Sequence, residues 1–152
     1  MLFRSMLINN TPIQWVSKRQ PTVETSTYGS ELIATRIAID MITEMRYKLR
    51  MLGVPLKGSS LLLGDNMSVV LNTTIPASPL KKKHLACAYH QIREAIAGGI
   101  IEYAHIESKE NVVDLFTKTV GTNLFQDLVD RLHGVYQTTL QSLRMENMPC
   151  QL

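Results

Sequence analysis

The longest regular pattern of apolar side chains lies between residues 26 and 52. Apolar residues recur there every four positions, at Ile33, Ile37, Met41, Met45 and Leu49. This spacing places them on one face of an α-helix, so the segment predicts a long amphipathic helix. Ser26 or Thr27 can cap its first turn. Gly53 suits its end, and Pro55 prevents the helix from continuing.

Shorter patterns predict the remaining elements. Residues 5–17, SMLINNTPIQWVS, are typical of a hairpin of two short strands around an Asn-Asn-Thr turn. Residues 61–63 and 100–106 indicate two further strands, the first of them short and buried. Helical segments are expected at 67–71, 82–97, 111–118 and 122–132. The order of these elements predicts one α/β fold around a mixed β-sheet flanked by helices.

Composition narrows the class of protein. The chain has 152 residues, of which 45% are hydrophobic, and this is the size of one domain with one core. A net charge of +3 is compatible with a polyanionic partner without requiring one. The apolar runs are too short for a secretory signal or a membrane span. Cys87 and Cys150 lie far apart and show no disulfide or metal spacing, so we expect a cytoplasmic or nuclear protein without a membrane partner.

Three acidic residues occupy positions where an α/β fold presents reactive groups. Glu31 lies near the start of the long helix, Asp65 follows the strand LLLG, and Asp114 lies near the start of a later helix. Each has an ordinary explanation, since acids favour helix starts and Gly-Asp-Asn favours turns. Together they offer the hard oxygen ligands that Mg²⁺ prefers. Two such ions, roughly 3.5–4 Å apart, support phosphodiester cleavage.

Four blocks of sequence follow one another in a specific order. They are WVSKRQPTVETSTYGSELIA at 15–34, LLLGDNMSVVL at 61–71, KKKHLACAYHQIRE at 81–94 and NVVDLFTK at 111–118. Together they resemble the ribonuclease H domain at the end of copia-type LTR retrotransposon polyproteins. The resemblance implies a ribonuclease H-like fold. It also implies hydrolysis of the RNA strand of an RNA–DNA hybrid, with four carboxylates and two Mg²⁺ (or Mn²⁺) ions.

The resemblance also assigns roles to particular residues. It places the second, third and fourth catalytic, metal-binding carboxylates at Glu31, Asp65 and Asp114. In the third of the four blocks, some side chains are expected to pack and others to contact the nucleic-acid backbone. The candidates for contact with nucleic acid are Lys81, Lys82, Lys83, His84, His90 and Arg93. The three lysines are equally explained as a phosphate-facing patch or as a solvated helix start.

The chain also departs from the pattern of the family. The first carboxylate belongs to a strand before the hairpin, and no Asp or Glu precedes Glu24. We therefore expect residues 1–133 to form a truncated ribonuclease H-like domain without its first strand, with 134–152 as a marginal helix or disordered tail. Thr119 stands where the family usually has proline. The expected partners are RNA–DNA hybrid or other nucleic acid, together with other parts of a transposon polyprotein.

Loss of one ligand of a two-metal site removes electrostatic stabilisation of the transition state. We therefore expect an inactive chain whose metal is weakly bound. The alternative is a non-catalytic remnant with a nucleic-acid-binding or structural role.

Overall fold

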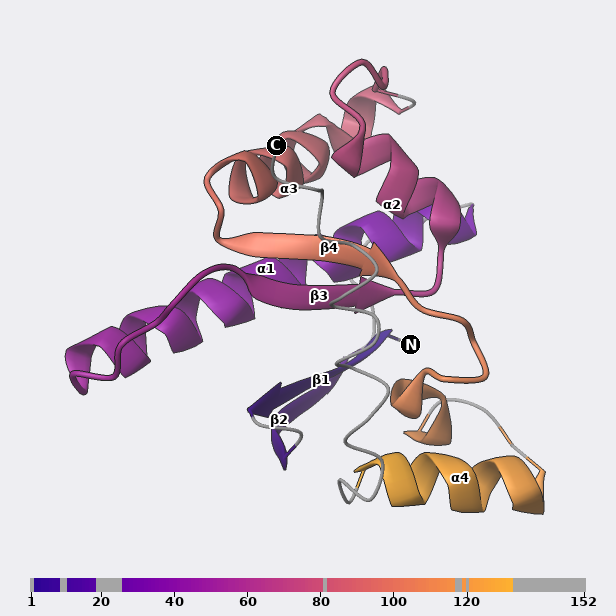
Figure 1. The fold of residues 1–152 in the computed structure, drawn as a ribbon. Coiled ribbons are helices and arrows are strands. Elements are labelled where there is room, and N and C mark those ends of the chain that lie inside the picture. The colour runs from indigo at the N-terminus through magenta and orange to yellow at the C-terminus, as the bar shows by residue number, and fades with distance from the viewer. Residues whose placement is uncertain are drawn as a thin grey trace, which may run out of the picture.

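The fold is a mixed arrangement of helices and short strands, as the sequence predicts (Figure 1). The computed structural model describes residues 2–8, 11–18, 26–80, 82–116, 119 and 121–132. Along the chain the elements are β1 (Leu2–Ile8), β2 (Thr11–Lys18), α1 (Thr27–Met51), β3 (Ser60–Gly64), α2 (Met67–Thr74), η1 (Lys83–Leu85), α3 (Ala86–Ala97), β4 (Ile101–His105), η2 (Val112–Phe116) and α4 (Thr122–Leu132). The expected tail at 134–152 lies outside the described residues.

The strands form two separate pairs and not the single mixed sheet that the sequence predicts. β1 and β2 are antiparallel, with an irregularity between Met6 and Leu7. β3 and β4 are parallel, with Gly64 opposite His105. Both pairs contact α1, but no described strand forms hydrogen bonds with both pairs. The expected sheet is therefore interrupted between β1 and β3.

Helix α1 begins and ends as its sequence predicts. The Ser26 hydroxyl accepts a hydrogen bond from the Gly29 amide at 3.3 Å, and Gly53 follows the helix with φ of 75°. A positive φ at this position favours glycine. The predicted buried face is wrong in detail, because the most buried apolar side chains of α1 are Leu32 and Ile39. The C-terminal end of α1 extends past β3 (Figure 1).

The main core lies where α1, α2 and α3 pack around the β3–β4 pair. Its buried members are Leu32, Ile39, Val69, Val70, Leu85, Ala88, Tyr89, Ile92, Ala95, Ile101 and Tyr103. Burial of each large apolar side chain stabilises the fold by about 1.5–3 kcal/mol. The strand at β3 is less buried than the sequence predicts, because Leu61 is 47% exposed. None of the described helices combines the length and apolar character that a membrane crossing requires.

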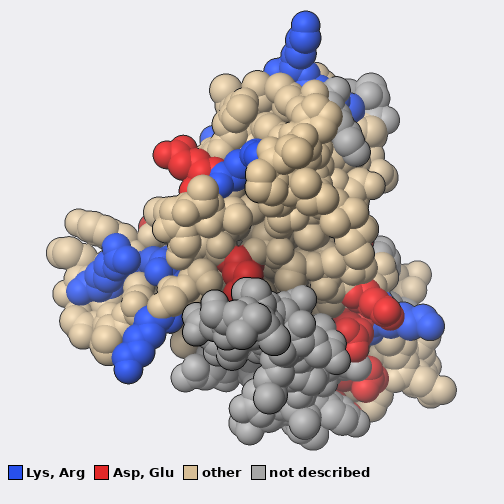
Figure 2. All heavy atoms as spheres, turned by 45° about the horizontal axis from the view of Figure 1, so that its top comes forward, with Lys and Arg blue, Asp and Glu red and all other residues tan. Residues whose placement is uncertain are grey.

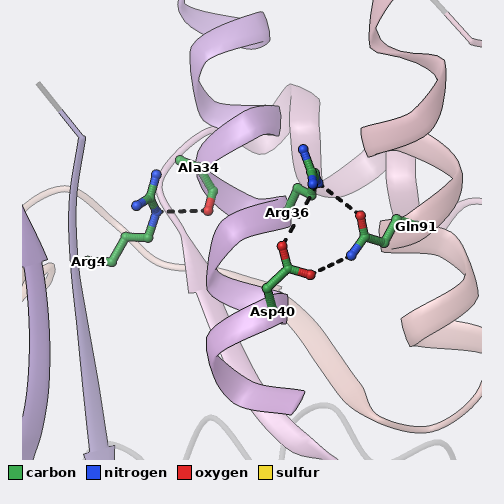
Figure 3. Close-up of polar contacts among 5 residues, drawn as sticks. All are labelled: Arg4, Ala34, Arg36, Asp40 and Gln91. Atoms are coloured by element: carbon green, nitrogen blue, oxygen red, sulfur yellow. Dashed lines mark hydrogen bonds and ion pairs between the residues drawn. The ribbon is translucent and has the colours of Figure 1, made fainter. Parts of the chain in front are cut away.

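Polar contacts of α1 connect it to its neighbours on two sides (Figure 3). Arg4 on β1 donates from Nε to the Ala34 carbonyl at 2.9 Å. On the other side, Arg36 and Asp40 of α1 contact Gln91 of α3 at 2.9 Å and 2.6 Å. Arg4 is buried, and its Nη2 has no hydrogen-bond partner in the described part of the chain. Burial lowers the pKa of Arg4, and the charge of Glu31 opposes that shift.

Candidate metal-binding site

The turn between β3 and α2 presents Asp65. β3 ends at Gly64, and Asn66 caps α2 through its Oδ1, which accepts hydrogen bonds from the amides of Ser68 (3.1 Å) and Val69 (3.4 Å). This cap satisfies amides at the start of the helix, so the chain turns sharply after the strand. The half-buried Asp65 carboxylate makes no hydrogen bond or ion pair with the residues that the structure describes. It is therefore available to a ligand.

Glu31 and Asp65 line the same open pocket, although they come from different elements. Its volume is about 310 Å³. The lining residues are Thr27, Glu31, Asp65, Asn66, Met67 and Ser68. Glu31 is half-buried in the second turn of α1, and the other residues that line the pocket are mostly polar. The structure thus brings together two of the three acids that the sequence singles out.

The third acid is placed only by its backbone. Asp114 lies on η2, a short 3₁₀ helix where the sequence predicts a longer helical segment at 111–118. Its side chain lies outside the described atoms, so its role as a ligand stays a prediction. Among the side chains that are described, no group of three or more His, Cys, Asp or Glu residues is arranged to hold a metal ion.

The residue types that line the pocket are those that a hard cation prefers. Mg²⁺ is commonly bound by one or two carboxylates together with water and phosphate oxygens. Glu31 and Asp65 provide the carboxylates, and Thr27 and Ser68, which carry hydroxyls, line the same pocket. A pair of ions would need more carboxylates than these two side chains supply.

Two residues of β4, His105 and Tyr103, contact the elements that carry Asp65 and Glu31. His105 Nε2 is 3.2 Å from the Asp65 carbonyl oxygen. The Tyr103 hydroxyl is 3.1 Å from Thr35 Oγ1 on α1. The alternation in IIEYAHI placed residues 101, 103 and 105 on one face of the strand, which is the signal that could have identified both residues.

The environment of Tyr103 is dry and negatively charged. Burial raises the pKa of Tyr103 to about 12, and the hydrogen bond with Thr35 opposes this shift. The charges of Glu31 and Asp65 add smaller increases. Tyr103 therefore remains a neutral hydrogen-bond donor throughout the physiological pH range.

The basic residues of the third block lie around η1 and α3. Lys81 lies outside the described residues. Lys82 donates from Nζ to the Ser26 hydroxyl at 2.6 Å, beside the start of α1. Lys83 and His84 are exposed on η1. His90 is exposed on α3. Contact of these residues with nucleic acid stays a prediction.

Arg93 has structural contacts that the sequence did not reveal. Its guanidinium donates to the carbonyls of Ile75 (3.0 Å) and Pro76 (2.6 Å), and to the Tyr89 hydroxyl (2.8 Å). These bonds hold the loop after α2 against α3.

Lys and Arg side chains are spread over the face of the molecule that Figure 2 shows, with one group over the C-terminal end of α1.

Comparison with known proteins gives homologues among plant transposons. The chain is 26% identical over 128 residues to the retrovirus-related Pol polyprotein from transposon RE1 of Arabidopsis thaliana, and the match covers 82% of this chain. It is 25% identical over 120 residues to that of transposon RE2, covering 79% of the chain. It is 32% identical over 125 residues to that of transposon TNT 1-94 of Nicotiana tabacum, covering 82%. The chain spans only 8–9% of the length of these polyproteins. No protein-family model and no solved structure matches it.

Proposed function

We propose that this chain is a ribonuclease H domain of copia-type retrotransposon origin, whose ancestral activity is hydrolysis of the RNA strand of RNA–DNA hybrids. The observation that carries the proposal is the shared pocket of Glu31 and Asp65. Similarity to Pol polyproteins over about four-fifths of the chain supports a transposon origin. The specific activity that we propose rests on the four sequence blocks, which resemble this domain.

Within this proposal the chain's own acids hold the cation. Bound Mg²⁺ or Mn²⁺ supplies an activated water and stabilises the leaving oxygen during phosphodiester hydrolysis. Asp65 offers a carboxylate without a competing partner among the described residues, at the end of a strand that fixes its backbone. Glu31 lies in the second turn of α1 and lines the same pocket. The open mouth of the pocket leaves room for a phosphate group of the substrate.

We infer that the 152-residue chain does not cleave hybrid by itself. The pocket has two described carboxylates, and Asp114 would add a third. The family resemblance calls for four. Removal of one stabilising group from such a site raises the barrier by about 3 kcal/mol, which is roughly a hundredfold in rate.

Metal binding and hybrid cleavage test the proposal separately. Isothermal titration with Mn²⁺ is expected to show binding by the full chain and a loss of about tenfold or more in affinity for Asp65→Asn. Glu102→Gln, which changes an exposed carboxylate on β4, is the matched control and should bind as the parent chain does. Unchanged affinity in Asp65→Asn would overturn the metal site. Metal-dependent cleavage of labelled hybrid that is abolished in Asp65→Asn would overturn the inferred inactivity.

The alternative function is a non-catalytic remnant that binds nucleic acid or serves a structural role. The exposure of Lys83, His84 and His90 along one segment favours the binding form of this alternative. Hybrid binding that weakens with salt and with Lys83→Glu, in a chain that does not bind Mn²⁺, would select it.

A further inference from the structure

The ring of Tyr103 lies directly against the backbone that carries Asp65. A methyl group built on Gly64 would lie 2.5 Å from the Tyr103 hydroxyl oxygen and 3.0 Å from Cε2. Such distances are shorter than ordinary van der Waals contact, so a larger residue at Gly64 would displace the ring or the strand. Glycine at this position therefore allows the tyrosine to pack on the last residue of β3.

The hydroxyl of Tyr103 also reaches the backbone that carries Glu31. Thr35 Oγ1 donates to the Glu31 carbonyl oxygen at 2.9 Å. Thr35 Oγ1 also lies 3.1 Å from the Tyr103 hydroxyl, and either hydroxyl can donate in that contact. A continuous path of hydrogen bonds thus runs from β4 to the turn of α1 that begins at Glu31.

We propose that Tyr103 is a positioning residue for the candidate metal site, because it sets the position of Glu31 on α1 relative to Asp65 at the end of β3. The metal part of this inference rests on the function proposed above. Tyr103 is only 7% exposed, so its hydrogen bond is shielded from competition with water. A cation with short ligand distances requires that carboxylates from two elements be held at a fixed separation.

His105 and Ile106, at the end of β4, contact the turn after β3. Gly64 accepts a hydrogen bond from the Ile106 amide at 3.0 Å, next to the contact of His105 with the Asp65 carbonyl. Loss of the Tyr103 hydroxyl therefore loosens this end of the strand pair but leaves its backbone ladder in place. The opposite end is marked by the bond from the Ser60 amide to the Ile100 carbonyl at 3.0 Å.

Tyr103→Phe tests the inference, because it removes the hydroxyl and keeps the ring. Mn²⁺ affinity, measured well below the melting temperature, is expected to weaken about threefold to tenfold. Tyr89→Phe is the matched control, since Tyr89 is also buried, donates its hydroxyl proton to the Ser78 carbonyl and does not line the pocket. It should lower stability without changing Mn²⁺ affinity.

Amide hydrogen exchange provides a readout without metal. In Tyr103→Phe, exchange at Ile106 is expected to accelerate about threefold to tenfold, with no matching change at Ser60. Mn²⁺ affinity that is unchanged in Tyr103→Phe, or that falls equally in Tyr89→Phe, would overturn the inference. If the parent chain binds no Mn²⁺, the function proposed above fails. Equal exchange at Ile106 and Ser60 would then reject the positioning role as well, whereas selective acceleration would support it.

Discussion

The side chain of Asn72 on α2 accepts a hydrogen bond from the Tyr28 hydroxyl on α1. The same buried amide donates to the Ser78 hydroxyl and, at 3.0 Å, to the Pro79 carbonyl. Asn72→Ala should therefore lower the free energy of unfolding by about 2–4 kcal/mol, because it leaves several polar groups without partners. Urea denaturation measures this change. Asn123→Ala, at an exposed position of α4, should change stability by less than about 0.5 kcal/mol.

Gly64→Ala should destabilise the chain by about 1–3 kcal/mol, because the added methyl group meets the Tyr103 ring. Thermal unfolding measures the loss. Combination with Tyr103→Phe should recover part of it, since the nearest clashing atom is then removed. Gly121→Ala is the control, because a methyl group there meets nothing within 4 Å. Strictly additive effects of Gly64→Ala and Tyr103→Phe would contradict the contact.

The raised pKa of Tyr103 predicts a loss of stability in alkali. In the unfolded chain the phenol loses its proton near its ordinary pKa of 10.0, whereas the folded chain retains it up to a pKa of about 12. The unfolded state thus binds fewer protons between these values, and the free energy of unfolding falls as the pH rises through this window. The full loss is about 2–3 kcal/mol. Denaturant unfolding at a series of pH values should show a smaller decline for Tyr103→Phe, and equal declines would argue against this titration.

The Asn66 cap predicts a graded series of variants. Asn66→Ala should cost about 1 kcal/mol, because the first amides of α2 lose their acceptor. Asn66→Ser retains an acceptor and should cost less. Chemical denaturation measures both stability losses. A larger loss for Asn66→Ser than for Asn66→Ala would be inconsistent with capping. Because Asn66 also lines the pocket, Mn²⁺ titration of both variants shows whether the cap also supports Asp65.

Local signals predicted most of the elements. The start of α1 follows from the hydroxyl of Ser26, its end from Gly53, and the stop of β3 before Asp65 from turn chemistry. These signals act over a few residues, so they can be recognised from the sequence. The family resemblance assigns Glu31 and Asp65 to one site, and the structure places both residues in the lining of one pocket. Their role as metal ligands stays a prediction.

Long-range packing accounts for what the sequence did not predict. A periodicity of four in α1 identified Ile33 and Ile37 as one face, but the helix is covered on several sides and its buried row runs through Leu32 and Ile39. The contact of Tyr103 with Thr35 joins positions 68 residues apart. Spacing within one element carries no information about such pairs.

The two strand pairs belong to two groups of elements. α1, α2 and α3 with β3 and β4 share one core, whereas β1 contacts its partner strand, α1 and η2, and η2 in turn contacts α4. Among the described elements, the main contacts between these two groups run through α1, so the groups need not melt in one cooperative step. A two-stranded hairpin contributes little stability alone. Substitutions in β2 should therefore shift the population of a state with a detached hairpin while the melting of the three-helix body stays the same.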